Sequence, residues 1–158
     1  MPKEPAPRRR RPATSPSMEQ YIETIAELQA NKRVCSVSDI ATHANVSRPA
    51  ASRAVRELSG KGLVEHQSYS YVVLSPDGEA LASRLSARHT TLQRFLADVL
   101  RYDDAMADRE ACRLEHLVDD EFVARLAQLT EFVEGDPQSA AQWRKRISRH
   151  LEGESRGT

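Results

Sequence analysis

Several features that would define a membrane, secreted or fibrous protein are scarce in this chain of 158 residues. No apolar run approaches the roughly 18 residues that a membrane-spanning helix needs, and the basic N-terminus lacks the apolar stretch of a signal peptide. The two cysteines, Cys35 and Cys112, are too few for a disulfide framework. Aromatic residues make up 5% of the chain, which favours small helical domains filled by Leu, Val and Ala. We therefore expect a cytoplasmic protein without a membrane partner.

Net charge is also lacking, but the charges are distributed unevenly along the chain. Residues 1–17 contain five positive residues against Glu4 alone, and residues 103–136 contain eleven acidic residues against three arginines. We expect residues 1–16 to form a disordered basic tail, which either contacts DNA phosphates or is simply solvated. The acidic stretch is typical of cation binding or of plain solvation.

Apolar spacing and capping residues predict a mainly α-helical chain. Apolar residues recur at three- and four-residue spacing from Ser17, which predicts a first helix. Ser47 and Pro49 predict the start of a helix that ends at Gly60 or Gly62. Two short strands, 63–66 and 71–74, follow with a hairpin-like connection. Further helices are predicted to begin near residues 75, 103, 119 and 136, the first of them running to about residue 101, so the predicted domains span 17–76 and 77–152.

The first of these domains has the element order of a winged helix-turn-helix, in which two short helices precede a β-hairpin. In the second short helix, Ala51, Val55 and Leu58 face inward, so its polar side chains fall on the other face. The predicted DNA-contacting residues are Ser47, Arg48, Pro49, Ser52, Arg53 and Arg56. Arginine can donate two hydrogen bonds to a guanine edge or bind phosphate. The hairpin residues 68–70 would form the wing, and the alternative is a helical domain with a solvated basic face.

Residues of metal-ligating types recur at helical spacing in three segments. They are Cys112, Glu115 and His116 in the acidic half, Gln20 and Glu23 on the first helix, and His89 on the long central helix. Positions i, i+3 and i+4 share a helix face, so each group can converge on one point. If these helices pack together, their oxygen and nitrogen atoms would suit a first-row transition metal. Taken singly, each residue is equally consistent with a salt bridge or a surface position.

Five segments of the chain resemble the metal-dependent repressors of the diphtheria toxin repressor and manganese transport regulator family. In the family's order they are SMEQYIETI at 17–25, VSRPAAS at 46–52, LSPDG at 74–78, Arg88-His89 and EACRLEHL at 110–117. The resemblance implies an N-terminal winged helix followed by a helical domain for metal binding and dimerisation. It also implies a repressor of metal-uptake genes that acts when its metal is plentiful.

Carried over by position, the resemblance implies a set of metal ligands. These are Glu23, His89, Cys112, Glu115 and His116, with Asp108 at an accessory position where histidine is usual. Cys112 resembles the iron-responsive branch of the family, whereas Glu23 resembles the manganese branch. Gln20 departs from both branches, which have Asp or Met there. We predict Mn²⁺ as the effector, with Fe²⁺ as the alternative.

The resulting prediction is a homodimer that binds a palindromic operator in double-stranded DNA and is not an enzyme. Two apolar stripes are predicted to form the dimer face. They consist of Leu92, Phe95, Leu96 and Val99, and of Leu114, Leu117 and Val118. The alternative is that they fill the core of the single chain. One rival function is a winged-helix regulator that senses an organic ligand or oxidation of Cys112. Another is a small metallohydrolase with Glu115 as general base, which would leave the DNA-reading helix and the wing unexplained.

Overall fold

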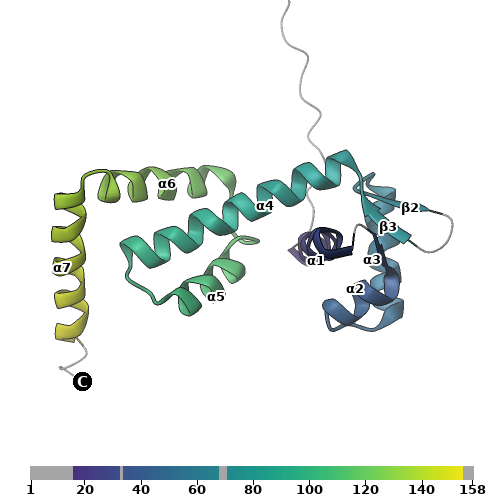
Figure 1. Cartoon of the computed structure of the whole chain (residues 1–158), viewed down its shortest axis with the longest axis horizontal. Coiled ribbons are helices and arrows are strands. Elements are labelled where there is room, and N and C mark those ends of the chain that lie inside the picture. The colour runs from purple at the N-terminus through teal and green to yellow at the C-terminus, as the bar shows by residue number, and fades with distance from the viewer. Residues whose placement is uncertain (1–15, 33, 68–70, 155–158) are drawn as a thin grey trace, which may run out of the picture.

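A computed structural model describes residues 16–32, 34–67 and 71–154, and Figure 1 shows a winged helix at one end of the molecule and a helical body at the other. The basic tail and the wing tip at 68–70, both predicted from the sequence, lie outside the described residues. The long helix α4 (Pro76–Arg94) runs from one part to the other. No helix in the described part of the chain is long and apolar enough to cross a membrane.

The winged part contains three helices and a small antiparallel sheet. Its elements are α1 (Pro16–Lys32), β1 (Cys35–Ser36), α2 (Val37–His43), α3 (Arg48–Gly60), β2 (Val64–Gln67) and β3 (Tyr71–Leu74). The strand order is β1-β3-β2, with Cys35 opposite Val72. The sequence did not predict β1, because two residues are too few to show an alternating pattern. The two predicted strands and the helix-turn-helix are confirmed.

Side-chain caps start both helices of the helix-turn-helix. Ser36 accepts a hydrogen bond from the Asp39 amide at 3.1 Å, and Asp39 accepts one from the Ser36 amide at 2.9 Å, so a capping box begins α2. Ser47 accepts a hydrogen bond from the Ala50 amide at the start of α3. These caps satisfy helix N–H groups that have no partner inside the helix, and they fix where α2 and α3 begin.

The helical body is formed by the second half of α4 and the elements that follow it. These are the π-helical turn η1 (Phe95–Val99), α5 (Asp104–Leu114), α6 (Asp120–Glu134) and α7 (Pro137–Glu154). The predicted regular helix to residue 101 is therefore wrong at its end, since the last turn is π-helical and Arg101 has a φ of 64°. The last helix, α7, begins where predicted, and its Trp143 Nε1 donates a hydrogen bond to the Val99 carbonyl of η1 at 3.0 Å.

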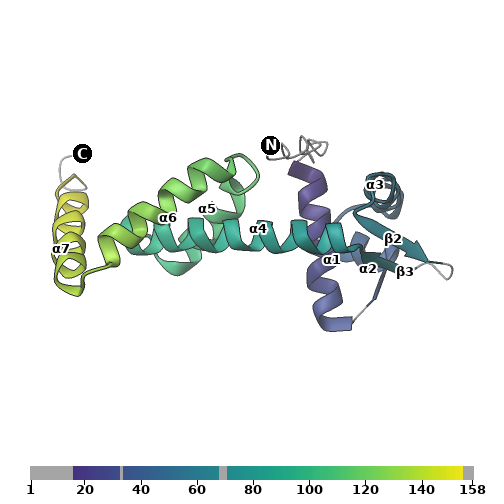
Figure 2. The same cartoon turned by 90° about the horizontal axis from the view of Figure 1, so that it is seen from above.

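The two parts share α4 but have separate cores. Leu81 and Leu85 of α4 join the winged-helix core with Ile22, Ile25 and Leu58, whereas Leu92 and Leu96 form a second core with Ala107 and Ala111 of α5. Because α4 is packed at both ends, it holds the DNA-reading part and the helical body together. In Figure 2, α1 crosses the half of α4 that belongs to the first core.

Most of the predicted dimer stripe lies in the core of the single chain instead. Leu92, Leu96 and Val99 are buried, and Phe95, Leu114 and Val118 pack against the second core. Leu117, which is 75% exposed, is the exception within the stripe. Other large apolar side chains are exposed on α6, namely Phe122, Leu129 and Phe132, the last at 83%. One exposed apolar face of the helical body therefore lies on α6 and the turn before it.

Candidate metal centre

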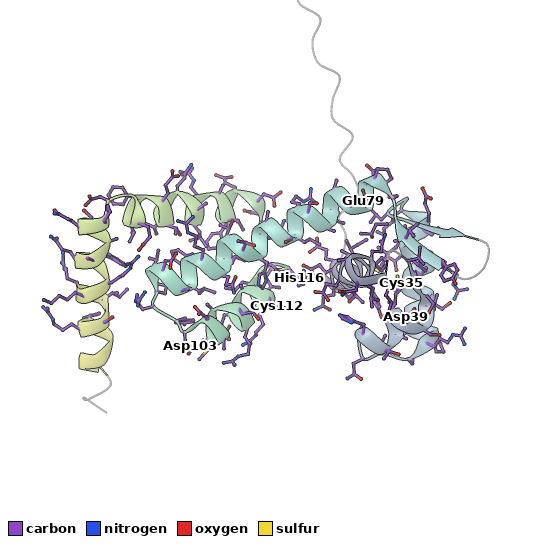
Figure 3. The ribbon with its side chains drawn as sticks, in the orientation of Figure 1. Cys35, Asp39, Glu79, Asp103, Cys112 and His116 are labelled. Atoms are coloured by element: carbon purple, nitrogen blue, oxygen red, sulfur yellow. The ribbon has the colours of Figure 1, made fainter. Side chains whose placement is uncertain are left out.

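Three of the predicted metal residues, Glu23, Glu115 and His116, come together where α1 and the end of α5 meet beside α4. The helix α5 ends at Leu114, Glu115 is its C-cap residue, and His116 lies in the turn that follows. The expectation that Cys112, Glu115 and His116 share one regular helix face is therefore wrong for His116. The turn directs the imidazole toward α1, and Figure 3 shows His116 between α1 and the helical body.

Three glutamates surround the His116 ring. The ring Nδ1 lies 3.1 Å from an oxygen of Glu19, and Nε2 lies 3.5 Å from an oxygen of Glu23 and 3.5 Å from an oxygen of Glu115. Glu19 and Glu23 are one turn apart on α1, which places both carboxylates on the same helix face. The Glu115 residue is 2% exposed and the His116 side chain 5%, so this cluster is buried at the junction of the two parts.

The residues of this cluster are suited to binding a cation. Ligand atoms of Glu23, Glu115 and His116 all lie within 4.8 Å of one another. The buried Nε2 of His116 has no hydrogen-bond partner among the described residues. A buried polar atom of this kind is costly unless something binds it. A divalent cation would bind the free imidazole nitrogen and compensate the carboxylate charges at the same time.

The pKa of Glu23 is raised by its burial and, to a smaller extent, by the neighbouring negative charge. Burial is the largest cause that raises it, and the neighbouring carboxylate of Glu115 raises it further, to a pKa of about 7 from the ordinary 4.5. The imidazoles of His116 and His89 act in the opposite direction and do not overcome these two effects. Without a cation, Glu23 therefore holds a proton more readily than an exposed glutamate does.

His89 and its neighbour Arg88 attach the end of α5 to α4. His89 Nδ1 lies 2.9 Å from an oxygen of Glu115, and its Nε2 lies 3.2 Å from Asp108. Arg88 donates hydrogen bonds of 2.6 Å to the Glu115 carbonyl and to Asp120. These contacts from α4 fix the backbone and the carboxylate of Glu115.

The predicted ligands Cys112 and Gln20 lie less centrally. Cys112 is exposed and, with Glu23, His89, Asp108 and Glu115, lines a hollow of about 450 Å³ beside the cluster. Burial and then the charge of Glu115 raise the pKa of its thiol, so the thiolate is disfavoured without a metal. Gln20 is exposed and does not line this hollow.

Glu19 is the cluster residue that sequence reasoning missed. The sequence prediction paired Gln20 with Glu23 at i, i+3 and did not consider Glu19, which pairs with Glu23 at i, i+4. The second spacing also places two side chains on one helix face. Two acidic residues on the inner face of a helix with buried neighbours were the signal that could have identified Glu19.

The predicted DNA-contacting residues lie along one side of α3. Arg48, Pro49, Arg53 and Arg56 are exposed, and Ser52 is half-buried, whereas Ala51, Ala54, Val55 and Leu58 are buried against the first core. Ser47 is exposed and caps the helix. The arrangement leaves three arginines free to approach a groove and the backbone of DNA.

A winged helix whose first helix shares a buried carboxylate and imidazole cluster with a helical body defines a metal-dependent DNA-binding regulator. Comparison with known proteins agrees. Residues 13–72 match the N-terminal DNA binding domain of the iron dependent repressor, and residues 75–144 match its metal binding and dimerisation domain. The chain belongs to this family of metal-dependent transcription repressors.

Individual relatives come from both branches of the family. The chain is 33% identical over 123 residues to the HTH-type transcriptional regulator MntR of Lysinibacillus sphaericus, covering 78% of this chain and 88% of the relative. It is 32% identical over 119 residues to the diphtheria toxin repressor of Corynebacterium efficiens, covering 75% of this chain and 52% of the relative. Among solved structures, the manganese regulator SloR matches with a TM-score of 0.64 and 34% identity, covering 75% of this chain and 55% of SloR. The chain thus spans about half the length of these last two relatives.

Proposed function

We propose that this protein is a repressor activated by Mn²⁺, which binds a palindromic operator as a homodimer and controls genes for manganese or iron uptake. Fe²⁺ is the alternative effector. The proposal rests mainly on the buried cluster of Glu23, Glu115 and His116, in which an imidazole nitrogen without a hydrogen-bond partner among the described residues faces two carboxylates. This cluster joins a helix of the DNA-binding part to a helix of the body.

The donor set supports a hard or borderline divalent cation. Glu23, Glu115 and His116 would hold the ion, and the resemblance adds His89 and Cys112 as further ligands. Asp108 and Gln20 occupy two more ligand positions, at which this chain departs from the family. Carboxylates and imidazoles suit Mn²⁺ and Fe²⁺, whereas thiolate favours softer ions. The thiol of Cys112 is not among the three clustered donors and has a raised pKa, which supports Mn²⁺. Similar solved structures named as a manganese regulator and a manganese-dependent transcriptional repressor support the same choice.

The position of Glu23 supports a coupling between metal binding and DNA binding. Glu23 lies on α1, whose neighbouring residues Ile22 and Ile25 pack in the same core as Leu58 of α3. Residues that hold one ion from both α1 and the end of α5 would favour one arrangement of the reading helix relative to the body. A ligand that binds one arrangement better than another shifts the population toward it.

A second copy of the chain is the proposed partner of the exposed apolar face. This face consists of Leu117, Phe122, Leu129 and Phe132. Large exposed apolar patches commonly mark interaction sites, and the matched body domain is described as a dimerisation domain. A dimer must place two reading helices about one DNA turn apart, roughly 34 Å, to bind both halves of a palindrome.

The rival functions receive less support. Family membership favours a metal over an organic ligand, and the raised pKa of Cys112 disfavours the thiolate that oxidation requires. We propose that the protein is not a hydrolase, because the relatives it matches are transcription regulators. A cytoplasmic location is part of the same proposal.

The test measures binding to the promoter beside the protein's own gene, first with chelator and then with each divalent ion. Mn²⁺ should raise operator affinity tenfold or more, and Glu115→Ala and His116→Ala should abolish that rise. Glu110→Ala is the matched control, because Glu110 is on the same helix and pairs with Arg113 outside the cluster. A full metal response in both cluster variants would refute the site. Activation of the wild type by Fe²⁺ alone would keep the site and replace the metal.

A further inference from the structure

One contact of the cluster has no place in the ligand set described above. Glu19 Oε2 lies 3.1 Å from Nδ1 of His116, whereas the other two glutamates approach Nε2. The Glu19 side chain is 13% exposed and the His116 side chain 5%, so water competes little for this hydrogen bond. The contact also crosses from α1 to the turn after α5, residues that are 97 positions apart.

We propose that Glu19 is a positioning residue, which accepts the Nδ1–H of His116 and thereby directs an unprotonated Nε2 at the bound metal. An ionised carboxylate can only accept a hydrogen bond, so the proton of a neutral His116 ring is held on Nδ1. The lone pair is then on Nε2, which faces Glu23 and Glu115. This inference rests on the proposed metal function and assigns a role to a residue outside its ligand set.

The geometry distinguishes this role from that of a further ligand. Glu23 and Glu115 approach Nε2, the nitrogen with no hydrogen-bond partner among the described residues, whereas Glu19 approaches the other nitrogen. Since Glu19 and Glu23 are one turn apart on α1, a single helix supplies both a ligand and the acceptor that orients a second ligand. Removing a carboxylate that orients a metal-binding histidine in this way commonly weakens metal binding by about 10- to 100-fold.

The experiment titrates the full-length protein with Mn²⁺ and follows the free ion by electron paramagnetic resonance. The variants are Glu19→Ala, Glu19→Gln and Glu27→Ala. Glu27 is the matched control, because it is on the same helix and lines the hollow beside the cluster but pairs with His43 at 2.7 Å. Glu19→Gln keeps the size of the side chain and an oxygen that can accept the Nδ1–H, so it reports on the site even if the alanine variant does not fold.

Glu19→Ala should weaken Mn²⁺ binding by about 10- to 100-fold. Glu19→Gln should weaken it less, and Glu27→Ala should leave it within about twofold. A second measurement is the His116 Nδ1–H resonance of the ¹⁵N-histidine protein loaded with diamagnetic Zn²⁺, assigned by its absence in His116→Ala. This proton should be protected from exchange in the wild type and unprotected in Glu19→Ala.

Two outcomes would overturn the role of Glu19 while leaving the metal site intact. One is an equal effect of Glu19→Ala and Glu27→Ala on affinity, which would indicate a general charge effect. The other is an unchanged Nδ1–H resonance in Glu19→Ala. Failure of the wild type to bind metal would instead refute the proposed function, and the inference with it.

Discussion

Replacing Glu23 with glutamine should make the stability of the metal-free protein less dependent on pH. Burial and the nearby Glu115 raise the pKa of Glu23 from 4.5 to about 7 in the folded protein. A carboxyl with a raised folded pKa binds its proton more tightly when folded than when unfolded. Its stabilising contribution is therefore complete below about pH 4.5 and is lost as the pH rises through about 7.

The size of the effect follows from the difference between the two pKa values. At 1.36 kcal/mol per pH unit, a rise from 4.5 to about 7 corresponds to roughly 3 kcal/mol of stability between pH 4 and pH 8. Because the Glu23 side chain is 25% exposed, solvent screening makes this an upper bound. Glutamine has a similar shape and no titrating proton, so it removes this dependence with little change in packing.

The assay is urea unfolding of the wild type and Glu23→Gln with chelator present, at several pH values from 4 to 8. The free energy of unfolding of the wild type should fall relative to that of the variant as the pH rises. Taking the difference between the two proteins cancels most contributions from other titrating groups. Saturating Mn²⁺ should restore the wild type at high pH, because a metal requires deprotonated ligands and stabilises the state that binds it.

A difference between the two proteins that stays constant from pH 4 to pH 8 would refute the reasoning. It would mean that the Glu23 carboxylate is solvated or compensated in the metal-free protein, so that the cluster carries no surplus of negative charge. A difference that changes in the opposite direction would mean that the imidazoles dominate over Glu115. Either result would remove the electrostatic argument for a cation at this position.

Four further predictions concern other parts of the molecule. Arg53→Ala should weaken operator binding by about 1–3 kcal/mol in a gel-shift titration and leave metal affinity unchanged, since Arg53 is exposed on α3 far from the cluster. Phe132→Glu should shift the protein from dimer to monomer in sedimentation experiments, and an unchanged dimer would remove α6 from the interface. Trp143→Phe should cost about 1 kcal/mol in thermal unfolding, because it removes the hydrogen bond between α7 and η1. Deleting residues 1–15 should flatten the salt dependence of DNA binding but keep operator preference, and an identical slope would indicate that the basic tail makes no contact.

Local chemistry made much of the fold predictable. The sequence predicts helices that begin at Ser47 and near residues 103 and 119, and Ser47, Asp103 and Asp119 each cap a helix in the structure. A cap depends on a few consecutive residues, and strand alternation and helical spacing are similarly local. The strand β1 and the π-helical turn η1 could not be predicted, because both depend on pairing and packing with distant segments.

The orientation of His116 in the metal cluster could not be predicted from neighbouring residues alone. The residue types of the motif containing Glu115 and His116 predict metal binding. Helical spacing also predicts that His116 lies on the same helix face as Glu115, but His116 lies in the turn after the helix. The helix ends at Leu114, and the turn that follows is held by Arg88 on another helix. The orientation of His116 is therefore decided by packing between α4 and α5, which spacing within one segment does not contain.

The sequence by itself determined the order of the elements, the exposed arginine-bearing face of α3 and the residue types of the candidate metal site, because each depends on neighbours along the chain. The tertiary structure decided that Glu19 rather than Gln20 contacts His116, that most of the apolar stripe fills the core of the single chain, and that α6 presents the exposed apolar face. These outcomes depend on the rotation of each helix about its axis when it packs on α4. A rotation of one residue, about 100°, decides which side chain enters a buried cluster and which faces solvent.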